Sequence, residues 1–139
     1  MKIAPEHTSD EVLHHMGKPG KQSLIEFKRM FDELNKETGK KQFLTYYLIA
    51  AHPGCKDSHM QELKQFTTHE LKINPEQAQV FTPTPGTYSA VMYYTEMDPF
   101  AKEKIFVEKD TLRKERQKEI VVAKKSFCKS KKENLGMQG

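Results

Sequence analysis

The chain has 139 residues, which is enough for one ordinary domain with a hydrophobic core and too few for two. Hydrophobic residues make up 36% of the chain and charged residues 30%, and no run approaches the roughly eighteen apolar residues of a membrane-spanning helix. The first residues are polar where a secretory signal would need an apolar stretch. The composition therefore predicts a cytoplasmic protein without a membrane segment.

The net charge of +4 is concentrated at the carboxyl end of the chain. Residues 124–139 hold five lysines against the single acidic residue Glu133, whereas the rest of the chain is neutral in sum. This segment has few apolar residues, which predicts a disordered lysine-rich tail. A basic tail adds salt-sensitive attraction to polyanions. Because the body of the protein carries no net charge, we do not expect a nucleic-acid partner.

The first elements predicted along the chain are one strand and two helices. Residues 2–6 (KIAPE) form a short extended segment. Residues 8–16 begin with a capping-box pattern and place their apolar side chains on one helical face. Residues 23–38 repeat apolar side chains at intervals of three and four, which predicts a long amphipathic helix ended by Gly39.

Two further strands follow, with a helix between them. Residues 43–51 are too apolar for a half-exposed strand, and they predict a strand buried on both faces, as in parallel sheets. Asp57 or Ser58 is the predicted cap of the next helix, and residues 78–82 are the third predicted strand. Helices between successive strands predict parallel crossover connections in an α/β fold.

The pattern becomes irregular after the third predicted strand. Residues 83–86 contain two prolines and a glycine and predict an extended loop, and residues 89–95 predict a short helical turn. Residues 104–107 predict a short strand, and Asp110 is the predicted cap of a charged helix that reaches about residue 123. With only three core strands, the predicted sheet has a long exposed edge.

Three blocks of sequence occur in an order that resembles a known family. They are KIAPEHTSDEVLHHMGKP, YYLIAAHPG and VFTPTPGTYSAVMYYTEMDPF. Together they resemble the second half of a YgiQ-type radical S-adenosylmethionine (SAM) protein, over residues 2–123. The resemblance implies a partial (β/α) barrel, with its carboxyl-terminal half in residues 1–82. A short irregular α+β extension in residues 83–123 and the tail in residues 124–139 would follow.

The chemistry of that family depends on a cysteine motif that this chain lacks. In the family, a C-x3-C-x2-C motif holds a 4Fe-4S cluster that chelates SAM, and reduction yields methionine and a deoxyadenosyl radical. Here the two cysteines are Cys55 and Cys128, and a cluster usually takes three or four thiolates. We expect this chain alone to bind no cofactor and to be inactive, whereas the full-length parent would use the cluster and SAM. The expected partner is the missing amino-terminal half of the barrel.

The resemblance also indicates which residues would contact SAM. Ile3 and Ala4 would make apolar contacts with the adenine, and Ala51 and His52 would offer backbone hydrogen bonds to it. In such barrels, ligands gather at the carboxyl ends of the strands. Glu6 follows the first strand and would face the same mouth, or would be a solvated residue ahead of the helix.

The turn His52-Pro53-Gly54-Cys55 has three interpretations. His52, Cys55 and His59 supply three zinc ligands, but no fourth ligand follows at the usual spacing. A nucleophilic Cys55 would benefit from the start of the following helix, but no residue evidently orients His52 as a base. In the simplest interpretation Pro53 and Gly54 make the turn and Cys55 fills a small space. We therefore assign no catalytic and no metal-ligating residue.

A different class of function is also compatible with the sequence. A stand-alone binding or interaction module would use the exposed sheet edge and the basic tail to meet a partner. A small metal-dependent enzyme built on His52, Cys55 and His59 is a third, weaker alternative.

Overall fold

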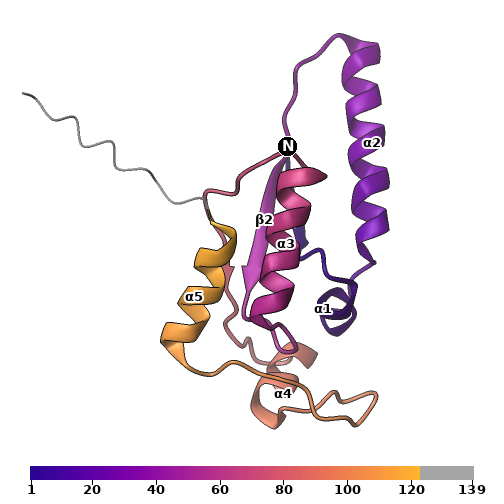
Figure 1. The fold of residues 1–139 in the computed structure, drawn as a ribbon. Helices are drawn as coiled ribbons and strands as arrows, with labels where there is room; N and C mark the ends of the chain where they lie inside the picture. Colours follow the sequence, from indigo (N-terminus) through magenta and orange to yellow (C-terminus); the bar gives the residue numbers. More distant parts are fainter. Residues whose placement is uncertain (123–139) are drawn as a thin grey trace, which may run out of the picture.

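The computed structural model describes residues 1–122, which contain one small parallel sheet and five helices (Figure 1). The predicted tail, residues 124–139, lies outside the described residues. The sheet has the order β1-β2-β3, and both strand pairs are parallel. This arrangement confirms the α/β prediction, while the partial barrel stays a prediction. The strands are β1 (Lys2–Glu6), β2 (Thr45–Ala50) and β3 (Gln79–Val80), and the helices are α1 (Asp10–His15), α2 (Lys21–Thr38), α3 (Asp57–His69), α4 (Tyr88–Thr95) and α5 (Thr111–Val121).

The hydrophobic core joins β2, α3 and α5. In Figure 1, α3 and α5 run side by side, while α1 and α4 lie near the end toward which the β2 arrow points. Burial of these side chains is the main favourable term in folding. The buried cluster consists of Val12, Leu48, Ala50, Cys55, Met60, Leu63, Ala78 and Val121.

Helix α2 stands apart from this core. Its apolar residues recur on one face, as the sequence predicts, and Gly39 ends it with a positive φ of 67°. None of its residues is buried, and it has no extensive contact with any other described element. In Figure 1 it lies at the side of the molecule, away from α5.

The middle strand is shorter and less buried than the sequence predicts. Phe43 is 79% exposed and precedes β2. Within the strand, Leu48 and Ala50 are buried, whereas Tyr47 and Ile49 are only half-buried. The prediction of a strand buried on both faces is therefore wrong for this chain, because only one face meets the core.

Other local predictions were partly wrong. Residues 104–107 form no strand, and the region has one isolated antiparallel bridge between Met97 and Lys104. Helix α3 begins after Lys56 rather than after Asp57 or Ser58. The prediction for Asp110 is confirmed, because its Oδ1 accepts a hydrogen bond from the Arg113 N–H at 2.9 Å.

The helical turn predicted at residues 89–95 is part of α4. Thr87 is its N-cap, and the Oγ1 atom of Thr87 accepts a hydrogen bond from the Ala90 N–H at 3.2 Å. Within residues 1–122, no helix combines the length and the apolar character that a membrane crossing requires.

Candidate functional site

The backbone has unusual geometry at the carboxyl ends of both long strands. Glu6, the last residue of β1, has a φ of 66°, and Ala51, which follows β2, has a φ of 59°. Positive φ is uncommon for residues other than glycine, and such strain often gathers at functional sites. Because β1 and β2 are parallel neighbours, the two residues lie at the same edge of the sheet.

His7 lies between β1 and α1, and its side chain bonds to the backbone just before the helix. Its Nδ1 accepts hydrogen bonds from the Thr8 and Ser9 N–H groups, both at 2.9 Å. The predicted capping box is not formed, because Ser9 is the N-cap and makes no side-chain capping bond. Since Nδ1 accepts two hydrogen bonds, the proton of the neutral ring is on Nε2. That nitrogen lies 3.6 Å from the Sγ of Cys55.

The Cys55 thiol is buried and unsuited to nucleophilic chemistry. Its sulfur donates to the Lys56 carbonyl at 3.8 Å and faces the His7 Nε2–H. Burial raises the pKa of Cys55 to about 12 and lowers the pKa of His7 to about 3, so both groups are neutral near pH 7. A nucleophile or an iron ligand needs the thiolate. The thiol therefore fills space in the core, as the simplest interpretation of the turn predicts.

His52 connects the end of β2 to α4. Its Nδ1 lies 2.9 Å from the Pro53 carbonyl, which can only accept, so Nδ1 carries the proton of the neutral ring. The Nε2 atom then accepts a hydrogen bond from the Ser89 hydroxyl at 2.8 Å. Burial lowers the pKa of His52 to about 4, which keeps the ring neutral. The ring also meets Phe81 edge-on, with the centroids 5.0 Å apart.

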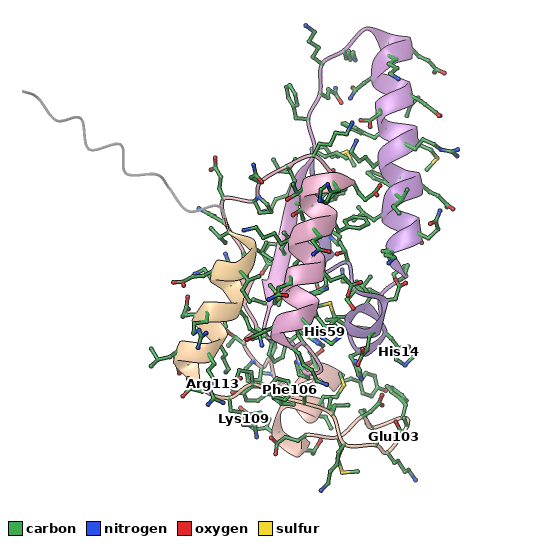
Figure 2. The ribbon with its side chains drawn as sticks, viewed as in Figure 1. His14, His59, Glu103, Phe106, Lys109 and Arg113 are labelled. Atoms are coloured by element: carbon green, nitrogen blue, oxygen red, sulfur yellow. The ribbon has the colours of Figure 1, made fainter. Side chains whose placement is uncertain are left out.

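His59 connects α3 to α1. Its Nδ1 accepts the Lys56 N–H at 3.0 Å, so its Nε2 carries the proton and lies 3.1 Å from the Glu11 carboxylate. Figure 2 shows His59 between the two helices, whereas His14 extends from the other side of α1 and is exposed. His15, its neighbour, is half-buried and its Nε2 lies 3.9 Å from the Asp98 carboxylate.

The residues of the zinc alternative do not converge on one point. His52 bonds to Ser89, Cys55 faces His7, and His59 pairs with Glu11. Among residues 1–122, no group of three or more His, Cys, Asp or Glu side chains is placed to hold a metal ion. The described residues therefore offer no support for the metal-dependent enzyme.

Gln117 of α5 holds the turn after β2 in place. Its side chain is 1% exposed, its Oε1 accepts the Ala51 N–H at 3.1 Å, and its Nε2 donates to the Cys55 carbonyl at 3.2 Å. The Phe106 carbonyl, also from the segment that leads to α5, accepts the Gly54 N–H at 2.7 Å. The carboxyl-terminal region therefore fixes the geometry of this strand end.

The residues that the resemblance predicts for SAM contact fall into two groups. Ile3 and Ala4 line a cavity of about 250 Å³ beside α2, whereas Ala51 and His52 are buried and do not line it. The Ala51 N–H is bound by Gln117, and the His52 carbonyl accepts the Cys55 N–H at 2.8 Å. Any adenine contact at this turn would therefore use the Ala51 carbonyl or the His52 N–H.

The carboxylate of Glu6 is turned toward a lysine. Its Oε1 lies 3.3 Å from the Lys18 Nζ, which also donates to the Ala4 carbonyl at 2.8 Å. The carboxylate is 24% exposed and is therefore partly shielded from solvent. Its role toward a ligand stays a prediction.

Sequence reasoning missed three of the residues that build this region. Gln117 precedes Ile120 and Val121 by three and four positions, and this helical spacing was the available signal for a buried polar residue. Ser89 and Glu11 gave no comparable signal, because their partners are 37 and 48 residues away in the sequence.

Comparison with known proteins places most of the chain within longer relatives. It is 63% identical over 125 residues to a UPF0313 protein of Fusobacterium nucleatum, which covers 90% of this chain and 22% of that protein. It is 42% identical over 125 residues to a UPF0313 protein of Thermotoga petrophila, with 90% and 22% covered. For a UPF0313 protein of Clostridium perfringens the values are 40% over 121 residues, with 87% and 18% covered.

These relatives are much longer than the aligned segment. The chain spans about a fifth of the length of each relative, and the name UPF0313 states no chemistry. No family profile matches the sequence.

Proposed function

We propose that this chain is the carboxyl-terminal portion of a radical SAM iron-sulfur enzyme of the UPF0313 type, and that it is inactive alone. In this proposal its three parallel strands are the last part of a partial (β/α) barrel, and the turns after β1 and β2 form one side of the mouth. The cluster and SAM belong to the full-length protein.

The observation that carries the proposal is the arrangement of the strand ends. Glu6 and Ala51 adopt positive φ at the carboxyl ends of adjacent parallel strands, the edge at which barrel enzymes bind their ligands. The Thr8 hydroxyl, two residues after β1, is buried without a hydrogen-bond partner among the described residues. Such a group favours the presence of a further polar partner at this edge.

The cluster itself does not fit the described residues. Cys55 is their single cysteine, its pKa is raised to about 12, and its sulfur faces His7 inside the core. The thiolates must therefore come from another part of the full-length protein. What this chain would supply is the apolar surface of Ile3 and Ala4 and the backbone groups of Ala51 and His52.

The test uses a chimaera of the longer relative. The aligned 125 residues of the Fusobacterium protein are replaced by those of this chain, and both chimaera and isolated chain are reconstituted anaerobically with iron and sulfide. We expect the chimaera to bind a 4Fe-4S cluster and, with dithionite, to convert SAM to methionine and 5′-deoxyadenosine, and the isolated chain to do neither. A chimaera and a parent that both lack a cluster would refute the proposal, as would SAM cleavage by the isolated chain.

A variant of the chimaera tests the contact residues. Ala4→Glu places a carboxylate at the predicted adenine surface, and we expect weaker SAM binding with an unchanged iron content. Lys2→Glu, on the same strand, is the matched control. Equal SAM affinity in both variants would remove Ala4 from the proposed site.

A further inference from the structure

An apolar surface of α2 is only partly covered by the described residues. We define the α2 face as Leu24, Phe27, Phe31 and Leu34, which recur at intervals of three and four on one side of the helix. Leu34 is 58% exposed and the flanking Met30 is 52% exposed. The opposite side of α2 is polar and includes Arg29, Glu33 and Lys36.

A helix of this kind depends on packing for its stability. Isolated helices of about this length are marginal in water, and most helical stability in proteins comes from burial of an apolar face. Yet none of the 18 residues of α2 is buried. Because Leu24, Phe27 and Phe31 are half-buried and Leu34 is exposed, the described residues supply only part of the packing that the α2 face predicts.

The α2 face continues into a cleft beside the edge strand. Leu24 and Phe27 line a cavity of about 250 Å³ together with Ile3, Ala4 and Leu13. The sheet order leaves β1 with a neighbour on one side only. The open edge of β1 and the α2 face thus border the same cavity. This arrangement suits the binding of a strand to the edge of β1 and of an adjoining helix to the α2 face.

The length of the relatives identifies the occupant. About four fifths of the Fusobacterium protein lies outside the segment that this chain matches at 63% identity. We propose that the α2 face and the β1 edge bind a strand-helix unit from the remainder of the same UPF0313-type polypeptide. This inference rests on the proposal that the chain is part of such a protein, and it does not depend on radical SAM chemistry.

Cysteine labelling tests the cover directly. Leu34→Cys is made in this chain and at the aligned position of the full-length Fusobacterium protein, and each protein is treated with N-ethylmaleimide and mapped by peptide mass spectrometry. Because Leu34 is exposed here, the substitution leaves the fold intact. We expect fast labelling in the isolated chain and labelling at least about tenfold slower in the full-length protein. A tenfold difference corresponds to about 1.4 kcal/mol in the free energy needed to expose the side chain to the reagent.

A matched control and two adverse outcomes complete the experiment. Lys36→Cys, on the polar side of α2, should label fast in both proteins. Equal labelling rates for both positions in the full-length protein would overturn the inference. Concentration-dependent protection of Leu34→Cys in the isolated chain would also overturn it, because the occupant would then be a second copy. Neither outcome depends on a cluster, so a failure here is distinct from a failure of SAM cleavage.

Co-expression supplies an independent readout. A tagged form of this chain is produced in the same cells as the Fusobacterium protein without its aligned segment, and the recovered complex is quantified. We expect Leu34→Glu to lower the recovery about tenfold and Lys36→Glu to leave it unchanged. Equal recovery with both variants would contradict the role of the α2 face.

Discussion

Helices α3 and α2 both follow an amphipathic pattern, and only α3 lies in a packed region. In the packed region, which we define as β2, α3 and α5, the apolar side chains Leu48, Leu63 and Val121 are at most 1% exposed. In α2 the pattern is equally regular, but no residue is buried. An amphipathic pattern therefore predicts which face of a helix packs against other apolar residues. It does not show that those residues lie within the same segment of chain.

The two regions also differ in how their polar groups are satisfied. Around the packed region, histidines and Gln117 bond to backbone and side-chain groups far away in the sequence. In α2 the ion pair between Lys28 and Asp32 is local, four positions apart, and such pairs contribute only about 0.3–0.5 kcal/mol. We therefore expect the packed region to determine the stability of the chain.

The largest predicted effect is loss of stability in acid. The pKa of His7 is lowered to about 3 and that of His52 to about 4, against about 6.5 in the unfolded chain. The contribution of each neutral histidine to the free energy of unfolding is complete above pH 6.5. It is lost as the pH falls toward 3–4, because the unfolded state then binds more protons than the folded state. At pH 4.5 we expect a loss of about 2 kcal/mol for each histidine, measured by urea unfolding across pH.

A single substitution isolates the contribution of His7. Asn in place of His7 retains an acceptor for the Thr8 and Ser9 N–H groups and cannot be protonated in this range. We expect His7→Asn to remove about half of the acid dependence, and His14→Asn, at an exposed position, to leave it unchanged. An unaltered pH profile in His7→Asn would contradict the assignment.

Truncation of leucine compares the two regions directly. Leu63 of α3 is fully buried, so Leu63→Ala removes core contacts and leaves a cavity, at a cost of about 3 kcal/mol. Leu34→Ala, in α2, should change the unfolding free energy by less than about 0.5 kcal/mol. Urea unfolding followed by circular dichroism measures both. Similar losses for the two variants would show that α2 is packed in this chain.

Removal of the Gln117 side chain should have a somewhat smaller effect. Gln117→Ala leaves the Ala51 N–H and the Cys55 carbonyl without their partner in a buried position, and we expect a loss of about 2 kcal/mol. Gln22→Ala, at an exposed position of α2, is the control and should be close to neutral. A neutral Gln117→Ala would mean that other groups satisfy the turn.

The elements that could be predicted from the sequence depend on local interactions. Gly39 ends α2 through its own backbone freedom, and Asp110 caps α5 through a bond to a residue three positions away. The parallel order followed from the alternation of strands and helices. The two helix ends need only neighbours in the chain, and the parallel order follows from the succession of elements, so a single sequence contains enough information to predict them.

The features that could not be predicted depend on residues far apart in the chain. The side chains of Thr8 and Ser9 make no capping bond to α1, and the Nδ1 of His7 instead accepts their N–H groups. The other ring nitrogen of His7 faces Cys55, 48 residues away. The strand predicted over residues 43–51 is shortened, because its first residues meet no core. The site residues Ala51 and His52 were expected to offer free backbone groups, and the bonds with Gln117 and Cys55 became visible only in three dimensions.

The smallest predicted effect compares a glycine from each region. Gly54 has a φ of 86°, and a Cβ atom there would lie 2.8 Å from the Nδ1 of His15, whereas Gly39 has a φ of 67° with nothing within 4 Å of its Cβ position. An alanine at either position lowers the free energy of unfolding by about 1 kcal/mol, because its side chain is strained in the left-handed backbone conformation. At Gly54 the imidazole of His15 must also move, which weakens its bond to the Glu11 carbonyl. Gly54→Ala should therefore lose about 1 kcal/mol more than Gly39→Ala in urea unfolding, and equal losses would show that the turn after β2 yields as easily as the end of α2.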